Sequence, residues 1–343
     1  MEGVLSPNSP DAMLSQKLSS DSHQARLKTS TVRWRHIAQA LAPLVVLLLI
    51  CTVISLLTPR FLTEQNIINV VRQSSLNAIV AGGMTLVILT GGIDLSVGSL
   101  LAVSSVFAAG ALTGGASPIE SIMVGAAIGL GFGLANGLII TVGDVAPFIV
   151  TLGTMTIARG VALIYTNGAP IVATDPDFRY IGRGSVGPIP VPIIVLFIVY
   201  AIVYLLLNRT TLGGYLYAIG GNQEAARLSG VPVKICKTMA YAISGLLAGL
   251  TGVILTARLG SSQPNLGSGN ELDAIAAVVI GGTSLAGGRG GILGTLVGAL
   301  IIGVLSNGLN LMNVNAYYQP VVKGGVILLA ILIDRRVRTT SAA

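Results

Sequence analysis

The sequence is dominated by long apolar stretches from which charged residues are almost absent. Hydrophobic residues make up 52% of the chain, charged residues 10%, and the mean hydropathy is +0.83. A soluble domain carries roughly 25% charged residues, and a helix that crosses a membrane needs about 20 mostly apolar residues. The chain is therefore predicted to be an all-α integral membrane protein. About ten helices are expected to span the membrane, at Ile37–Leu57, Ile67–Thr90, Val97–Leu112, Ile119–Val142, Pro147–Tyr165, Val191–Leu207, Thr238–Ala257, Leu272–Leu285, Ile292–Leu311 and Val321–Ile333.

These spans divide the chain into five parts. Residues 1–35 are polar and rich in Ser, which predicts a disordered cytoplasmic tail. Spans one to six occupy 36–208, a cytoplasmic loop occupies 209–237, spans seven to ten occupy 238–334, and 335–343 form a second cytoplasmic tail.

The basic residues set the predicted orientation. Lys and Arg are concentrated before the first span, in the 209–237 loop and after the last span, so the positive-inside rule places both termini in the cytoplasm. The net charge of +7 does not indicate a nucleic-acid partner, because these residues lie beside apolar runs as topology signals do. Cys51 and Cys236 are the only cysteines, so the sequence predicts neither a disulfide framework nor a metal site.

Two patterns predict how the spans pack. Gly125, Gly129, Gly133 and Gly137 form a stripe that lets another helix approach closely in lipid. The motif LANGL at 134–138 is echoed by LSNGL at 305–309, and these two spans are expected to run in opposite directions. The echo predicts an inverted repeat that relates spans two to five to spans seven to ten.

A short amphipathic helix is predicted in the loop between the two halves. Asn222 is a plausible N-cap, Glu224 lies in the first turn, and Gly230 precedes Pro232 as a stop signal. The helix is either an ordinary surface feature or a docking helix for a soluble partner. The residues assigned to it are Asn222, Gln223, Glu224, Ala225, Ala226, Arg227, Leu228, Ser229 and Gly230.

Two loops, Asn167–Pro190 and Arg258–Glu271, are expected on the outer side. They are either solvated connectors or a landing surface for an external partner. Exposed charge of both signs is suited to orienting such a partner. The candidate docking residues are Asp177, Arg179, Arg183 and Arg258.

Uncharged polar residues within the spans are the candidates for a translocation path. Amide and hydroxyl groups can hydrogen-bond a sugar, but they can equally bond neighbouring helices. The candidates are Asn77, Thr85, Asn136, Asn307 and Asn310. A structural role is expected instead for Gly91, Gly92, Asp94 and Ser96, because the Gly pair permits irregular backbone and Asp94 or Ser96 can cap the next helix.

The sequence contains no GxxxxGK[ST], HExxH or GxSxG motif, so any energy must come from another polypeptide or an ion gradient. A secondary transporter or facilitator would predict paired intramembrane acids or a sodium site, and neither signature is found. An integral membrane enzyme would need a clustered catalytic set, which the sequence also lacks.

Five runs carry a family resemblance. They are MTLVILTGGIDLSVGSLLAVSS at Met84–Ser105, YTNG at Tyr165–Gly168, GGNQEAARLSGV at Gly220–Val231, ELDAIAAVVIGGTSLAGG at Glu271–Gly288 and NGLNLM at Asn307–Met312. With them the chain resembles the membrane permeases of bacterial ABC sugar importers, in the ribose, xylose and arabinose branch, and most closely the ribose permeases. The similarity covers about Phe61 to Asp334.

The resemblance implies a subunit of the bacterial cytoplasmic membrane that imports a pentose, most of all D-ribose. It implies a cytoplasmic ABC ATPase that binds ATP and Mg²⁺, a periplasmic sugar-binding protein and a second permease copy as partners. No cofactor is implied for the chain itself, and the predicted short helix becomes the ATPase coupling helix. Xylose, arabinose, allose, galactose or a quorum-signal furanose remain alternative cargoes.

Overall fold

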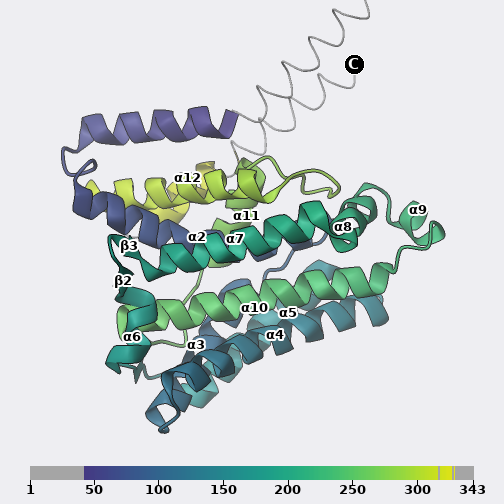
Figure 1. The fold of residues 1–343 in the computed structure, drawn as a ribbon, viewed down its shortest axis with the longest axis horizontal. Helices are drawn as coiled ribbons and strands as arrows, with labels where there is room; N and C mark the ends of the chain where they lie inside the picture. Colours follow the sequence, from purple (N-terminus) through teal and green to yellow (C-terminus); the bar gives the residue numbers. More distant parts are fainter. Residues whose placement is uncertain (1–41, 316, 327, 329–343) are drawn as a thin grey trace, which may run out of the picture.

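The fold was examined in a computed structural model that describes residues 42–315, 317–326 and 328. Its long helices lie side by side, roughly antiparallel (Figure 1). In chain order the helices are Ala42–Leu57, α2 (Glu64–Leu89), α3 (Val97–Thr113), α4 (Pro118–Val142), α5 (Pro147–Thr166), α6 (Pro176–Arg183), α7 (Val191–Arg209), α8 (Thr211–Gly221), α9 (Gln223–Leu228), α10 (Val233–Leu259), α11 (Asn270–Ile280) and α12 (Ile292–Leu311), followed by a helical segment at 319–326.

In the described part of the chain, strands are confined to two short antiparallel pairs. β1 (Ile171–Val172) pairs with β4 (Ser261–Ser262), and β2 (Ser185–Val186) pairs with β3 (Ile189–Pro190). Both pairs lie near α6, so this end of the bundle is closed by a compact cap of irregular structure (Figure 1). The observed architecture confirms the predicted all-α membrane class.

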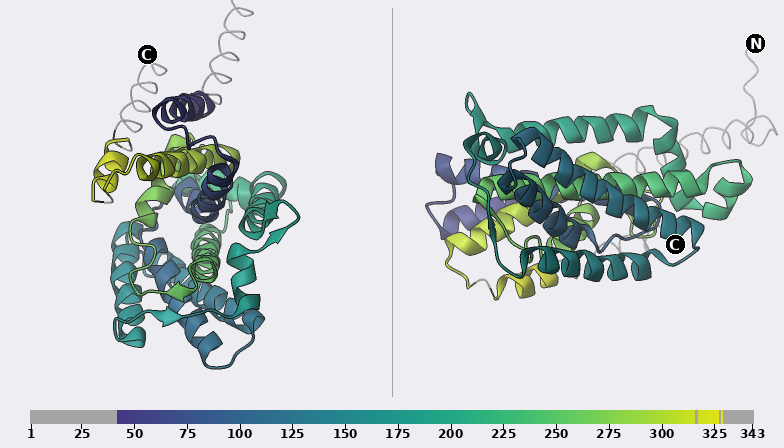
Figure 2. Two further views of the ribbon diagram at one scale, coloured as in Figure 1. Left: turned by 90° about the vertical axis from the view of Figure 1, so that its left-hand side faces the viewer. Right: turned by 90° about the horizontal axis from the view of Figure 1, so that it is seen from below.

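Five of the described helices are long and apolar enough to cross a membrane: α4, α5, α7, α10 and α12. They differ in burial, because 67% of the most apolar window is buried in α10 and α12, but only 28% in α4 and α5. The end-on view in Figure 2 accordingly shows α10, in green, near the middle of the bundle. The first described helix, Ala42–Leu57, packs through Ile54 against Gly308 of α12. Of the tenth predicted span, Val321–Ile333, the structure describes 321–326 and 328, all of them helical, and the other six residues lie outside the described part.

The glycine stripe packs as predicted. A Cβ on Gly129 would overlap the backbone of Gly245 and Gly249 on α10, and one on Gly133 would overlap the carbonyl of Tyr241. The α4 and α10 backbones are therefore in direct contact, which supplies the dispersion energy that replaces a hydrophobic driving force in lipid. In the second half, Gly294 of α12 makes the same kind of contact with the end of α11.

The packing partners follow the predicted inverted repeat. In the first half, α4 packs on α3 and crosses to α10; in the second half, α12 packs on α11 and crosses to α2. The third helix of each repeat, α4 or α12, therefore packs against the first helix of the other repeat, α10 or α2. Two repeats that exchange packing partners are expected to show this arrangement.

Three helices differ from the prediction. α6 lies where only a loop was expected, because Asp175 caps the amide of Phe178 and the Phe178 ring is completely buried. α8 adds a second helix to the 209–237 segment, packed through Gly220 against the ends of α2 and of the loop after α11. α11 ends at Ile280, five residues earlier than the predicted Leu285, and with 11 residues it is too short to cross a membrane.

Candidate transport and docking sites

The helix α9 projects from the end of the molecule opposite to α6 (Figure 1). Its start is as predicted, since the Asn222 side chain accepts a hydrogen bond from the amide of Ala225 at 2.9 Å. Its end is also as predicted, with Gly230 at φ +84° in the left-handed region that glycine tolerates best. The chain therefore turns back sharply and leaves α9 as the tip of a protruding arm.

The exposed face of α9 carries an ion pair and an apolar side chain. Arg227 donates to both carboxylate oxygens of Glu224, and both side chains are more than 60% exposed. This hydrogen-bonded contact lowers the pKa of Glu224, so the pair stays ionised at neutral pH and is lost only as acid protonates the carboxylate. Leu228 is 76% exposed, which gives a soluble partner both charge and apolar surface to bind.

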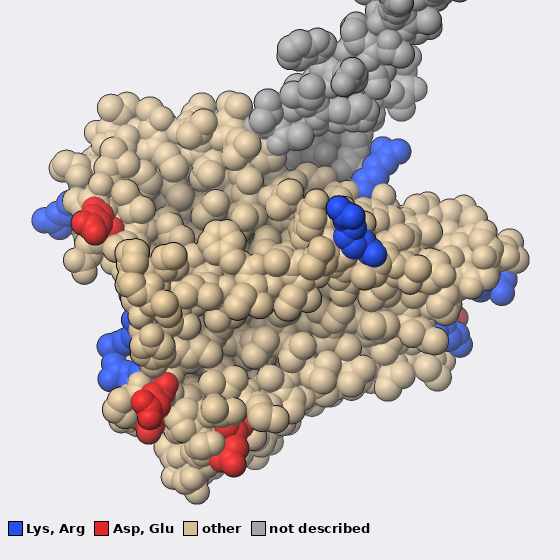
Figure 3. All heavy atoms as spheres, in the orientation of Figure 1, with Lys and Arg blue, Asp and Glu red and all other residues tan. Residues whose placement is uncertain are grey.

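The opposite end of the molecule carries the predicted docking residues, which are only partly brought together. Asp177 is exposed on α6, and the side chain of Arg179 lies half-buried beside Gly260. The Arg183 side chain donates to the backbone carbonyl of Arg258 at 2.5 Å, which ties the end of α6 to the end of α10. In Figure 3 the charges of this face gather toward the two ends, with an uncharged band between them.

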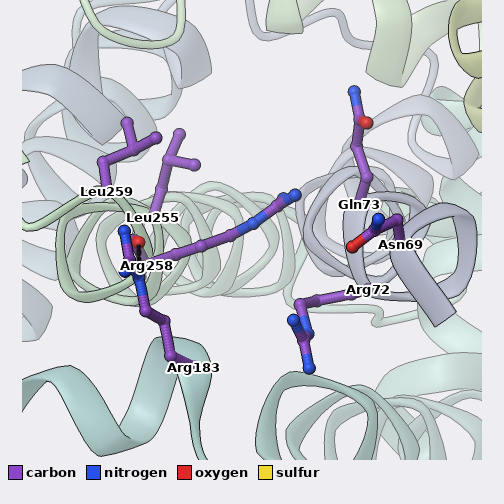
Figure 4. Close-up of a pocket in the computed structure, with 7 residues that line it drawn as sticks. All are labelled: Asn69, Arg72, Gln73, Arg183, Leu255, Arg258 and Leu259. Carbon is purple, nitrogen blue, oxygen red and sulfur yellow. Dashed lines mark hydrogen bonds between the residues drawn. The ribbon is translucent and has the colours of Figure 1, made fainter. Parts of the chain in front are cut away.

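A cavity of about 670 Å³ opens between α2, α6 and α10 at this end. Arg72, Arg183 and Arg258 line it together with Asn69, Gln73, Leu255 and Leu259. Arg258 extends across the cavity from α10 toward α2 (Figure 4). None of the three arginines forms an ion pair within the described part of the chain. An adjoining cavity of about 390 Å³ shares Asn69 and Arg72 and adds one acid, Glu64.

The three arginines thus gather positive charge at one cavity with no ion-pair partner in the described part of the chain. The sequence prediction placed all three arginines toward this end but counted only Arg183 and Arg258 as docking residues, since Arg72 lies two turns inside α2. Only the packing of α2 beside α10 shows that Arg72 shares a cavity with the other two.

The GGIDLS segment forms the centre of a buried polar network. The Asp94 carboxylate accepts from the amide and hydroxyl of Ser96 at 3.0 and 2.5 Å and from the hydroxyl of Ser244 at 3.2 Å. The Asn136 amide donates to Ser96 at 2.9 Å and accepts from Thr154 at 2.6 Å. The network joins the segment to α4, α5 and α10, and all five side chains are buried.

The expected capping role is wrong in detail. Neither Asp94 nor Ser96 accepts a hydrogen bond from an amide within α3, because both side chains are engaged with each other and with neighbouring helices. Gly91 takes φ +77°, and a Cβ on Gly92 would overlap the hydroxyl of Tyr241, so the two glycines are needed for the turn and for close packing.

Three of the remaining path candidates form hydrogen bonds at separate places in the bundle. Thr85 on α2 bonds Thr295 on α12 at 2.8 Å. Asn307 on α12 and Asn66 on α2 exchange amide hydrogen bonds of 2.9 and 3.1 Å in a buried pair. Asn310 accepts from Gln319 at 2.7 Å near the surface.

These contacts favour a helix-binding role for Thr85, Asn136 and Asn307, and the path role stays an untested prediction. Asn77 lies half-buried on α2. Asn66 was not among the candidates, because its position near the start of α2 gives no sign that it reaches Asn307. Among the described residues, no three His, Cys, Asp or Glu side chains gather closely enough to hold a metal ion.

Comparison with known proteins decides the family. Residues 66–331 match the family described as branched-chain amino acid transport system / permease component. The chain belongs to this permease family. The permease is 50% identical over 315 residues to the ribose import permease protein RbsC of Bacillus subtilis (strain 168), covering 91% of this chain and 98% of that protein.

Two further relatives are named as a ribose and an allose permease. The ribose import permease protein RbsC of Escherichia coli (strain K12) is 48% identical over 85% of this permease and 92% of its own length. The D-allose transport system permease protein AlsC of the same strain is 41% identical over 84% of this permease and 90% of its own length. No solved structure matches the permease.

Proposed function

We propose that the chain is the membrane subunit of an ABC importer that carries D-ribose into the cytoplasm. The observation that carries the proposal is the 50% identity to a ribose import permease over 98% of that protein. At 41% identity, the allose permease makes a hexose the second candidate cargo.

In this proposal α9 is the contact with a cytoplasmic ATPase, which binds ATP and Mg²⁺ and supplies the energy. The support is geometric, because α9 is the tip of an arm that carries an exposed ion pair and the exposed Leu228. The arm continues directly into α10, whose backbone is in direct contact with α4. A displacement of α9 would therefore be transmitted to the centre of the bundle as a rigid-body movement.

The end that carries α6 is the proposed contact with a periplasmic sugar-binding protein. Arg183 and Arg258 stand at the mouth of a cavity with Arg72 and carry no internal counter-charge in the described part of the chain. In this proposal α9 and both termini lie in the cytoplasm. The chain works with a second permease copy in the cytoplasmic membrane of a bacterium.

Uptake of radiolabelled ribose tests the cargo and the coupling together. The chain should restore ATP-dependent uptake to a bacterium that lacks its ribose import permease but keeps the ATPase and binding protein. Arg227→Glu should abolish uptake while the protein remains inserted, because the reversed charge would repel Glu224 and alter the docking face. The matched control Arg209→Glu, at the end of α7 before the α9 arm, should transport normally.

Two results would contradict the proposal. Restored uptake of allose but not of ribose would assign the cargo to the hexose branch. Full activity of Arg227→Glu would remove the coupling role from α9, and uptake without the ATPase subunit would favour a secondary transporter.

A further inference from the structure

The connection between α10 and α11 enters the membrane rather than crossing over its surface. It leaves the outer end of α10 at Gly260, and Ser262 then bonds Ser105 on α3 at 2.7 Å. Gly267 lies against Gly98, in the first turn of α3. Between these two contacts the connection descends seven residues of α3, which is about 11 Å at 1.5 Å per residue.

The depth of this segment follows from α3. Thr113, the last residue of α3, lies at the same end of the bundle as α6, and Gly98 is 15 residues further in, or about 22 Å. Since the hydrocarbon core is about 30 Å thick, Gly267 lies well inside the membrane. This depth also explains why α11 has only 11 residues, since it begins inside the membrane instead of at the surface.

An arginine holds the segment in place. Arg159 of the spanning helix α5 donates from Nη1 to the carbonyls of Pro264 at 2.6 Å and Leu266 at 3.0 Å. Glu271, at the start of α11, accepts from the amide of Gly269 at 3.2 Å. The Glu271 carboxylate also lies so close to Gly98 that a Cβ there would overlap it. A charged side chain within a membrane-spanning helix is costly. Its use to hold the carbonyls of Pro264 and Leu266 indicates that the position of this segment is important for function.

The segment carries polar side chains that the described part of the protein leaves exposed. Gln263, Asn265 and Ser268 are exposed, and so is Thr156, one turn from Arg159 on the same side of α5. Irregular backbone at membrane depth is tolerated only where protein buries it or where it lines a water-filled cavity. Exposed amides cannot face lipid without losing their hydrogen bonds to water, which costs several kcal/mol for each group.

We propose that the segment Ser261–Asn270 lines the sugar's path, with Gln263, Asn265 and Ser268 as the groups that the sugar meets. A neutral, hydroxyl-rich solute is served by uncharged amides and hydroxyls, which donate and accept in turn without holding it tightly. The proposal rests on the proposed function, and it assigns the path to residues other than the asparagines engaged between helices.

Cysteine accessibility tests the assignment in the complete transporter. Cys51 and Cys236 are first replaced by Ser in a background that still transports. Gln263→Cys and Asn265→Cys are then treated in membrane vesicles with the charged, water-soluble reagent sulfonatoethyl methanethiosulfonate. The matched control is Ile202→Cys, which is 58% exposed at a comparable depth on the apolar helix α7.

Both segment cysteines should react at least tenfold faster than Ile202→Cys, saturating ribose should slow their reaction, and modification should stop uptake. Reaction at the rate of Ile202→Cys from both sides, with and without ATP, would show that lipid or a second copy covers the segment, and would overturn the proposal. If both segment cysteines react fast but no sugar slows the reaction, the assignment of the sugar path to this segment is overturned, while the proposed function is not. Because labelling needs no ribose uptake, fast reaction slowed by a different sugar would instead refute the proposed cargo.

Discussion

The buried pair between Asn66 and Asn307 offers the sharpest test of whether a polar residue in this membrane protein binds helices together or contacts the cargo. The two amides join α2 to α12 across 241 positions of sequence. Replacing Asn307 by Leu removes both hydrogen bonds and leaves the Asn66 amide with only the carbonyl of Phe61, at 2.8 Å.

The expected loss in the free energy of unfolding follows from the two hydrogen bonds between Asn66 and Asn307. Hydrogen bonds between membrane helices average about 0.6 kcal/mol each, so the pair contributes about 1.2 kcal/mol to the free energy of unfolding, or about an eightfold change in the equilibrium constant. A buried amide left unpaired costs about 1–3 kcal/mol, which sets the upper limit for either single variant. Asn66→Leu and Asn307→Leu should therefore each destabilise by about 1–3 kcal/mol.

The double variant separates the two roles. Because it leaves no unpaired amide, Asn66→Leu with Asn307→Leu should be less destabilised than the sum of the single variants, by about 1 kcal/mol. Unfolding in mixed detergent micelles measures these free energies, with Asn310→Leu as a surface control. Additive effects would refute the pairing. Loss of uptake in Asn307→Leu with unchanged stability and unchanged ATPase activity would instead restore Asn307 to the translocation path.

Two further predictions concern the packing of α4 and the outer end. Gly129→Leu should reduce the amount of assembled protein several-fold, since a side chain there overlaps the α10 backbone and overpacking costs about 1–3 kcal/mol or more. The control Gly131→Leu should be tolerated, because no described atom lies within 4 Å of its Cβ position. Equal loss in both variants would refute close contact between α4 and α10. Charge reversal of Arg183 should raise the concentration of sugar-binding protein needed for half-maximal uptake, more at low salt than at high salt; a response without salt dependence would count against a charged contact.

Several local features could be predicted because their causes lie close together in the sequence. The bounds of α4 and α12 follow from apolar length, and their observed starts lie within one residue of the predicted ones. The start of α9 follows from Asn222, whose cap reaches only three residues ahead. The glycine stripe of α4 indicated a packing face because a four-residue repeat lies on one side of a helix.

Other features of the candidate sites could not be predicted, since their partners are far apart in the chain. Nothing near Asn307 indicates that it bonds Asn66, and nothing near Arg72 indicates that it faces Arg258. The signal for α6 was present in Asp175 followed by Pro176, an N-cap with Pro at the first helical position, but the polar composition favoured a loop.

The sequence by itself determined the membrane class, the starts of α4 and α12, the short capped helix between the two halves and the close-packing face of α4. These follow from transfer free energy and helix capping, which depend on composition and on neighbours within a few residues. Only the tertiary structure decided that the connection after α10 packs along α3, that three arginines share a cavity, and that Asn136 and Asn307 bond neighbouring elements. A buried polar group must find its partner wherever packing places one, and packing joins residues that the sequence keeps apart.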